Sequence, residues 1–296
     1  MIDGINIFYA GTRVNGWSEG LWPHKWGYSW SGFSAHGLST SYQYQITDMG
    51  TSLKIGTFCH ENGHMICGFP DLYSYNGNAA RISNYSLMAS SGSTHPVSVD
   101  PYLKIHAGWA DVVDLDSGSH QLCAVQADRN YFYRYRNPGN SLEYFLFEVR
   151  DNPGYEGPYG GAGGSVNPTA GLVVYHALQN GKNTYSSIFT ADNPNADYST
   201  PYELLVVEAS PVTAVTPWYD DPTPNGSDGF KSGGVSELSD STSPALKFWT
   251  SSGRTTDSQC HIHTISADSD TMTFIAGTGA LSGSPEIGLT VTTLTP

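Results

Sequence analysis

The chain has 296 residues, of which 39% are hydrophobic, and its 13 basic and 27 acidic residues give a formal charge of −14. A chain of this length and apolar content can bury a core without disulfides or a structural metal as staples. The acidic balance argues against nucleic acid and anionic membranes as partners, because both repel a negative surface. No apolar run approaches the roughly 18 residues needed to cross a bilayer, so no membrane insertion is expected.

The polar part of the composition points to an extracellular protein. Charged residues make up only 14% of the chain, and Ser, Thr, Asn, Gly and 19 tyrosines stand in their place. That mixture is associated with extracellular bacterial proteins, and we expect a secreted protein. The N-terminal segment has no basic region ahead of an apolar stretch, so no signal peptide is visible in it.

The first third of the chain combines a strand, an irregular stretch and two helices. Residues 2–10 alternate polar and apolar side chains and predict a strand. Residues 11–45 are rich in Gly, Ser, Trp and Tyr without a helical period, which predicts an irregular stretch. An apolar face between flanking glycines predicts a helix over residues 51–66. An Asp-Pro pair, suited to an N-cap and the first helical position, predicts a second helix over residues 100–106.

From about residue 113 the pattern changes to short alternating runs between Gly, Pro, Asn and Asp loops, and predicts a β-rich, sandwich-like domain. The clearest runs are residues 131–135, 144–149, 171–175 and 203–207. The last twenty residues, 277–296, pass from a Gly/Ser linker into a strand-like Thr/Val segment and look like the start of a further domain.

The four cysteines match no paired-cysteine zinc site. Cys59 and Cys67 are about 12 Å apart on a continuous helix, at about 1.5 Å per residue, which is too far for a disulfide. Cys123 and Cys260 lie in strand-like contexts. Both a disulfide between them, in an oxidising compartment, and buried free thiols are compatible with those contexts.

The segment His60-Glu61-Asn62-Gly63-His64 has the spacing of a zinc site. Two histidines four apart on a helix present both imidazoles on one face, one turn apart. Glu61 follows His60 directly, so its carboxylate can reach a water at an open metal position and act as general base. The motif alone is weak evidence for a metal site, because the same spacing also occurs by chance on solvated helix faces.

Two features that follow the motif strengthen the metal-site interpretation. Gly68 lets the chain turn off the helix, and Asp71 then stands at a distance suited to a third ligand. Three protein ligands leave the fourth zinc position for water, as hydrolysis requires. Further along, Met88 sits in a turn of small residues of the kind that forms the floor of the metal site in metzincin peptidases.

These segments resemble the immune inhibitor A family of secreted bacterial metallopeptidases. The resemblance is carried by HENGHMICGFPDLY, SLMASSG and KIHAGW, and extends to MIDGINIFYAGT, GLWPHKW, EYFLFEVR and GLVVYH, which together cover nearly all of residues 1–276. It implies that His60 and His64 bind zinc, that Asp71 is the third ligand and that Glu61 is the general base. It also implies that part of the catalytic domain, a signal and a propeptide precede residue 2, so that this chain is truncated at its N-terminus.

The chain departs from the family pattern in one place beside the metal site. Three residues separate His64 from Gly68, where the family has two. One extra helical residue rotates everything that follows by about 100°. Either the helix runs one residue further or a local bulge absorbs the insertion, and otherwise Asp71 misses the metal.

Several other polar groups are secondary candidates. An oxyanion donor is needed besides the metal, and the residues near the motif that can supply one are Tyr73, Tyr75, Tyr85 and His95. We expect Glu148 and Arg150 to form a structural ion pair, and His176, His261 and His263 to be structural histidines. Residues 192–197 and 220–228 are rich in oxygen ligands and suit either calcium or Asx turns.

Together these observations predict an α+β fold with a zincin-type, metzincin-like catalytic part. That part spans residues 1–112 and is truncated at its N-terminus, a β-rich sandwich-like domain follows over 113–276, and residues 277–296 are a linker and the start of a further domain. The expected function is that of a secreted, monomeric zinc endopeptidase acting on protein or peptide substrates. Two alternatives remain: a β-sandwich binding or adhesion protein with a vestigial metal site, and a zinc hydrolase of a non-peptide bond.

Overall fold

The computed structural model describes residues 4–16, 19–35, 38–51, 55–73, 75, 82–90, 96–115, 121–126, 130–150, 170–184, 201–209, 229–250 and 255–277. This part of the chain contains thirteen strands, in four sheets, and two α-helices. The helices are α1 (Gly56–Cys67) and α2 (Pro101–His106), and a short 3-10 turn, η1, spans Ser83–Tyr85. Neither helix is long and apolar enough to cross a membrane.

The predicted α+β fold with a zincin-type catalytic part is wrong. The described residues are mostly β-sheet, and their two α-helices span only 12 and 6 residues. The physical reason is that a helical period of apolar residues occurs only around the HENGH motif and after Asp100. Elsewhere the apolar residues form short alternating or continuous runs, which suit strands, or, as over residues 11–45, have no regular period.

The N-terminal sheet has three strands in the order β1-β3-β2. β1 (Ile5–Tyr9) runs parallel to β3 (Leu38–Asp48), and β2 (His24–Ala35) runs antiparallel to β3. The expectation of an irregular stretch over residues 11–45 is therefore wrong for most of its length. Trp26 stands opposite Tyr44 across the β2–β3 ladder, and such a cross-strand pair stabilises a ribbon that has no aliphatic alternation.

The central sheet has five strands in the order β4-β6-β7-β8-β9. Their bounds are β4 (Asp111–Asp114), β6 (Tyr131–Asn137), β7 (Asn140–Arg150), β8 (Gly171–Leu178) and β9 (Leu204–Val207). The four segments predicted as strands from their alternating pattern all lie in this sheet. β8 and β9 are buried along their whole length, so both faces of the sheet are covered.

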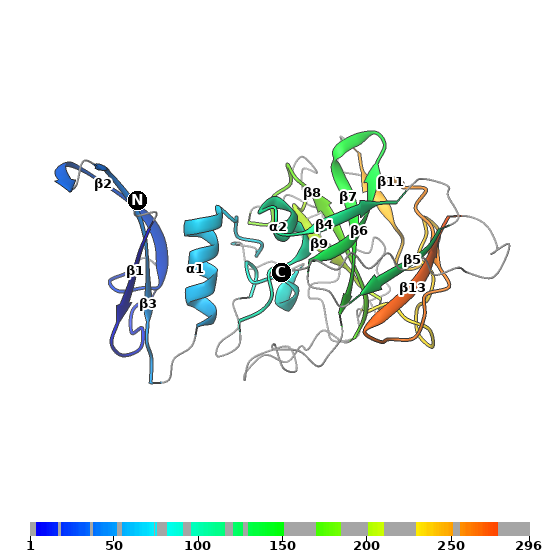
Figure 1. Cartoon of the computed structure of the whole chain (residues 1–296), viewed down its shortest axis with the longest axis horizontal. Helices are drawn as coiled ribbons and strands as arrows, with labels where there is room; N and C mark the ends of the chain where they lie inside the picture. The colour runs from blue at the N-terminus through cyan, green and yellow to red at the C-terminus, as the bar shows by residue number, and fades with distance from the viewer. Residues whose placement is uncertain are drawn as a thin grey trace, which may run out of the picture.

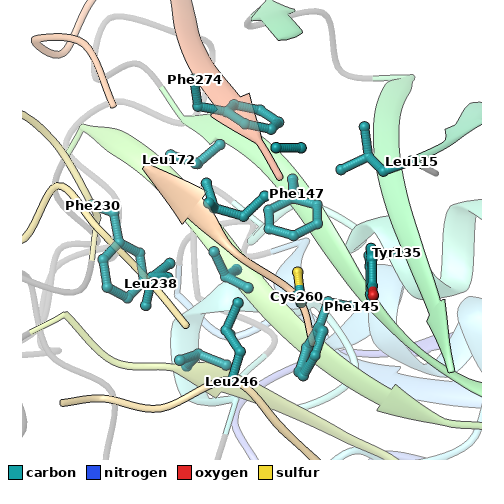
Figure 2. Close-up of a cluster of buried hydrophobic side chains, with 14 of the residues drawn as sticks. Leu115, Tyr135, Phe145, Phe147, Leu172, Phe230, Leu238, Leu246, Cys260 and Phe274 are labelled. Carbon is teal, nitrogen blue, oxygen red and sulfur yellow. The ribbon is translucent and has the colours of Figure 1, made fainter. Parts of the chain in front are cut away.

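One face of the central sheet packs against a second sheet of order β12-β13-β5. These strands are β12 (Ile262–His263), β13 (Thr271–Ala276) and β5 (Gln121–Gln126), and β10 (Lys247–Trp249) with β11 (Thr255–Asp257) forms a two-stranded ribbon. Figure 2 shows the resulting core, in which Phe145 and Phe147 of β7 meet Phe274 and the buried thiol of Cys260. Cys260 is free, which favours the buried thiol over the disulfide, and the side chain of Cys123 lies outside the described residues.

The opposite face of the central sheet carries the elements of the HENGH region. The alternate residues of β7, β8 and β9 point to this side and pack against α2, η1 and the segments that follow α1. Figure 1 shows α1 standing between the N-terminal sheet and this layer. α1 therefore touches β2 and β3 on one side and the segments on the central sheet on the other. Residues 278–296, which include most of the predicted linker, lie outside the described residues.

Truncation of Phe147 tests the core between the two sheets. Phe147 is fully buried and its ring centroid lies 5.7 Å from that of Phe274. We expect Phe147→Ala to lower the free energy of unfolding by about 3–5 kcal/mol, because a large buried ring is replaced by a cavity. Leu142→Ala on the same strand, at a side chain that is 39% exposed, is the control and should stay within about 0.5 kcal/mol of the parent. Equal losses for both variants in a urea titration would contradict the buried position of Phe147.

Candidate metal centre

Helix α1 extends one residue beyond the expected end and so absorbs the extra residue of the motif. The helix runs to Cys67, and Gly68 then takes the left-handed conformation with φ 69°. The N–H groups of Gly68 and Phe69 both donate to the carbonyl oxygen of Gly63, which closes the helix end. Glycine is required at this turn because a side chain is disfavoured at positive φ.

This helix end brings one carboxylate oxygen of Asp71 to both histidines. The Nε2 atoms of His60 and His64 are each 3.1 Å from Oδ1 of Asp71 and are 3.2 Å from one another. All three side chains are at least half buried, and together they form the group in the described part of the chain that could hold a metal ion. The structure therefore brings together the three side chains that the sequence pattern suggested as ligands.

The outer nitrogen of each ring is held by a backbone carbonyl. Nδ1 of His60 lies 2.9 Å from the carbonyl oxygen of Leu87, and Nδ1 of His64 lies 2.6 Å from that of Phe69. A carbonyl only accepts, so both Nδ1 atoms are the protonated donors and the Nε2 atoms of the neutral rings carry the lone pairs. Two lone pairs and a carboxylate oxygen within about 3 Å repel one another unless a proton or a metal cation lies between them.

The spacing of the three atoms suits a tetrahedral metal ion. Ligand atoms about 2.0–2.2 Å from a tetrahedral centre are separated by about 3.3–3.6 Å. The observed separations of 3.1–3.2 Å need only a small relaxation to reach this arrangement. Two imidazole nitrogens and one carboxylate oxygen are also a donor set that zinc and neighbouring divalent metals accept, and they leave one position open.

Charge coupling within the group sets the protonation states of its members. Burial opposes charge on His64, but the hydrogen bond and negative charge of Asp71 outweigh it and raise the pKa of the ring. Burial likewise opposes charge on Asp71, but donation from His60 and His64, when their Nε2 atoms carry a proton, and from Tyr75 outweighs it and holds the pKa of its carboxyl well below the usual range. Asp71 is therefore ionised at a pH where the His64 ring loses its proton.

Glu61 is a partly buried carboxylate beside the two histidines. Burial raises the pKa of its carboxyl, and Asp71 adds to that effect, while His60, His64 and His24 counteract it. His24 belongs to β2, where it stands opposite Ile46 of β3, so the N-terminal sheet supplies part of the electrostatic environment of Glu61. The His24 ring is fixed by the carbonyl oxygen of Trp22 and the hydroxyl of Tyr44.

Met88 lies under the HENGH segment, as the turn of small residues suggested. The side chain is fully buried, and a Cβ atom placed on Gly63 would come within 2.7 Å of its sulfur. The backbone N–H of Met88 donates to the hydroxyl of Ser86, which donates in turn to Asp100, the N-cap of α2. Burial raises the pKa of the Asp100 carboxyl to about 6. Helix α2 thus fixes the turn that supports the two histidines.

Two of the four suggested oxyanion donors lie beside the ligands. The Tyr75 hydroxyl donates to Oδ2 of Asp71, and the Tyr73 ring centroid is 6.2 Å from that of His60. Burial, with the charges of Asp71 and Glu61, raises the pKa of Tyr73 to about 12, so its hydroxyl keeps its proton. Tyr85 is instead fully buried in the cluster that lines the central sheet. His95 lies outside the described residues.

The predicted ion pair connects the central sheet to this region. Arg150 lies 2.7 Å from Glu148, and its second terminal nitrogen donates to the carbonyl oxygen of Tyr85 in η1. The pair is buried and pins η1, which lies just before the Met88 turn. Sequence reasoning overlooked Asn183, whose amide donates to the carbonyl oxygen of Leu72. Nothing in the sequence marks this asparagine, because it lies 111 residues after the segment it touches.

The remaining candidates lie apart from the centre. His176 is buried against Glu143 at 2.7 Å, and His261 pairs with Glu237 at 2.8 Å, as expected of structural histidines. The two suggested calcium loops, residues 192–197 and 220–228, lie outside the described residues.

Comparison with protein-family models and with curated proteins finds no match to the chain.

Substitution of Gly63 tests the contact between helix α1 and Met88. We expect Gly63→Ala to lower the free energy of unfolding by about 1–3 kcal/mol, because its methyl group would overlap the Met88 sulfur, 2.7 Å away, and the Phe69 ring, 3.3 Å away, in a packed site. Ile66→Ala on the same helix, at a side chain that is 67% exposed, is the control and should change stability by no more than about 0.5 kcal/mol. A Gly63→Ala protein more stable than its parent in thermal and urea unfolding would show that helix propensity outweighs the contact.

The pH dependence of metal binding tests the assignment of His64 as a ligand. A ligating imidazole must be deprotonated, and Asp71 raises the pKa of His64 above its ordinary value of about 6.5. We expect the apparent affinity for zinc to fall by at least about tenfold per pH unit once the pH drops below that raised pKa. Asp71→Asn should weaken binding and also move the onset of the fall to lower pH, because the group that raises the His64 pKa is gone. An affinity that stays constant between pH 5.5 and 7.5 in a chelator competition would contradict the assignment.

Proposed function

We propose that this chain is a zinc-dependent endopeptidase that hydrolyses peptide bonds in proteins or peptides. The observation that supports this most directly is the convergence of His60, His64 and Asp71 on one point, with Glu61 beside them. The extra residue ahead of Gly68 does not displace Asp71 from this point, because the helix accommodates it.

Zinc is the metal that this set of ligands favours on chemical grounds. Carboxylate and imidazole ligands in a three-residue set with an open fourth position are the pattern of hydrolytic zinc sites, whereas calcium and magnesium take six or more oxygens or waters. The carbonyl groups of Leu87 and Phe69 fix the ring orientation of both histidines. Such outer partners raise the basicity of the ligating nitrogens.

The chemistry divides between the metal and the residues around it. Zinc, when bound, supplies a Lewis acid that polarises the scissile carbonyl and lowers the pKa of a water molecule to about 7. Glu61 takes a proton from the attacking water, whose oxygen bonds to the carbonyl carbon. The same carboxyl then gives that proton to the amine as the C–N bond breaks, so the peptide and one water become an acid and an amine.

The environment of Glu61 suits this double role. A group that first accepts and then donates a proton works best when its pKa is close to the working pH. Burial raises the pKa of Glu61 above that of an exposed glutamate. Tyr73 keeps its proton over a wide pH range, and we assign its hydroxyl as the donor to the oxygen on which negative charge develops.

The family and the location of the protein are part of the same proposal. The motifs HENGHMICGFPDLY and SLMASSG support membership of the immune inhibitor A family, and the low charge content with many Ser, Thr, Asn and Gly residues supports secretion. We propose a monomer acting on protein or peptide substrates. A vestigial site in a binding protein is disfavoured by the intact ligand geometry, and hydrolysis of a non-peptide bond is the alternative outcome of the assay below.

Glu61→Gln separates catalysis from metal binding. The substitution keeps the size and burial of the side chain but removes the base, so we expect stoichiometric zinc and a fall in kcat of at least about 10²-fold. The measurement is zinc content by elemental analysis together with cleavage of casein and of internally quenched peptides by the full chain.

The control for this variant is Glu19→Gln, which removes an exposed carboxylate from the loop ahead of β2. Its activity should equal that of the parent. Stoichiometric zinc in the parent without cleavage of any peptide would favour the non-peptide hydrolase or the binding protein. A parent that binds no zinc would contradict the proposed function.

A further inference from the structure

We propose that Asn183, in the turn after β8, is a positioning residue for the third metal ligand, Asp71. The inference rests on the zinc-dependent function proposed above and adds a residue from the second half of the chain to the metal centre. His60 and His64 are aligned by the helix they share. Asp71 lies beyond the helix, in a segment with no regular structure, and its position must be set by other contacts.

Those contacts concentrate on the residue that follows Asp71. The N–H of Leu72 donates to the carbonyl oxygen of Met88 at 2.9 Å, and the carbonyl oxygen of Leu72 accepts from Nδ2 of Asn183 at 2.9 Å. Three residues further on, the N–H of Tyr75 donates to the carbonyl oxygen of Thr184 at 3.1 Å. The segment that carries Asp71 is thus held by the methionine turn on one side and by residues 183–184 on the other.

Asn183 uses the full hydrogen-bonding capacity of its amide. Nδ2 donates to the carbonyl oxygens of Leu72 and Leu204, and Oδ1 accepts from the N–H groups of Glu203 and Leu204 at 2.9 and 3.1 Å. An asparagine side chain has two N–H donors and an oxygen with two lone pairs, so all four sites are occupied. The residue is 2% exposed, and no other side chain of this size offers two donors and two acceptors in the same plane.

The turn that presents Asn183 is itself fixed to the central sheet. A Cβ atom on Gly181 would lie 2.5 Å from the carbonyl oxygen of Tyr202, so glycine is needed for the turn to approach the chain ahead of β9. Lys182 donates its N–H to the carbonyl oxygen of Pro201, and Glu203 accepts from the hydroxyl of Tyr102 in α2. Asn183 therefore connects the Asp71 segment to the fully buried strand at the edge of the central sheet.

This arrangement has a specific consequence for the metal centre. Without the Asn183 amide, the Leu72 carbonyl loses its partner, and the segment is held beside Asp71 by fewer contacts. The oxygen of Asp71 then no longer has a fixed place 3.1 Å from both histidines. Outer residues that orient metal ligands usually change metal affinity by about 10–100-fold when they are removed.

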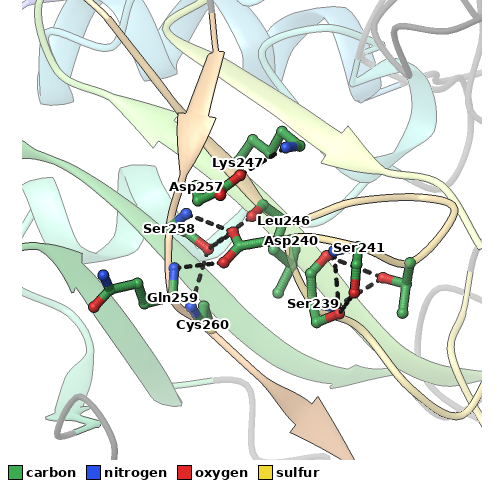
Figure 3. Close-up of polar contacts among 10 residues, drawn as sticks. Ser239, Asp240, Ser241, Leu246, Lys247, Asp257, Ser258, Gln259 and Cys260 are labelled. Atoms are coloured by element: carbon green, nitrogen blue, oxygen red, sulfur yellow. Dashed lines mark hydrogen bonds and ion pairs between the residues drawn. The ribbon is translucent and has the colours of Figure 1, made fainter.

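The test compares Asn183→Ala with Ser258→Ala in the full chain. Ser258 is also 2% exposed and lies between β11 and β12. Its hydroxyl makes hydrogen bonds to Asp240, Leu246 and Cys260. Figure 3 shows this network, which contains none of the metal ligands. Both variants lose buried hydrogen bonds and should have a lower Tm, so Ser258→Ala controls for instability alone.

Zinc affinity and the visible spectrum of the cobalt-substituted protein are measured at a temperature where both variants are folded by circular dichroism. We expect Asn183→Ala to raise the Kd for zinc by about 10–100-fold and to change the intensity of the cobalt bands, which report the coordination geometry. Ser258→Ala should leave both as in the parent. If Asn183→Ala does not fold, Asn183→Ser, which keeps one hydrogen-bonding group, is measured in the same way.

The outcomes distinguish this inference from the proposed function. A parent that binds zinc, with an unchanged Kd and cobalt spectrum in a folded Asn183 variant, overturns the positioning role and leaves the function standing. Equal losses of affinity in the Asn183 and Ser258 variants also overturn it, because instability alone then explains the effect. A parent that binds no zinc overturns both.

Discussion

Mutual repulsion between three electron-rich atoms is the constraint on which the rest of the structure around helix α1 depends. The Nε2 atoms of His60 and His64 and one oxygen of Asp71 lie within 3.2 Å of one another in a partly buried place. Each is held from behind by other contacts, and a cation between them would remove the repulsion. Two backbone carbonyls hold the rings, and the position of those carbonyls depends on the segments that follow the helix.

Those segments are ordered by the central sheet rather than by their own sequence. Between α1 and α2 the described residues form no regular element apart from η1. Their side chains fill one face of the sheet, where Leu72, Tyr85 and Met88 are fully buried. Buried polar groups then fix the backbone: Arg150 bonds the carbonyl of Tyr85, and the Ser86–Asp100 pair holds Met88. Apolar burial supplies the attraction, and the hydrogen bonds select one arrangement.

Because hydrogen bonds from other segments fix the backbone around α1, the geometry of the centre depends on residues from distant parts of the chain. The two histidines and Asp71 come from one short stretch, whereas the groups that place them include the Met88 turn, α2 and the turn after β8. The N-terminal sheet adds His24 to the surroundings of Glu61. A strand alternates its side chains between two faces, so β7, β8 and β9 serve the metal-site layer with one set of residues and the core of Figure 2 with the other. A substitution in that core can therefore shift the side chains of the metal centre, because both layers share the backbone of the sheet.

Much of the local structure follows from the sequence. The spacing of His60 and His64 requires a helix to bring both rings to one side, and Asp100 with Pro101 begins α2 as N-cap and first residue, with the Asp100 side chain accepting from Leu103. The alternating runs after residue 130 give the strands of the central sheet. The hairpin of β2 and β3 was missed, because its Gly, Ser and aromatic residues have little aliphatic alternation and pair only when the opposite strand is present.

By itself, the sequence determined which residues could act as ligands, the helix that aligns two of them and the turn at Gly68. Those features depend on neighbours within a few residues, where helix geometry and backbone sterics act directly. Only the tertiary structure decided that the helix absorbs its extra residue, that Asp71 meets both histidines and that Asn183 holds the segment beside it. These depend on contacts between residues far apart in the chain, which form only when the sheet buries both of its faces.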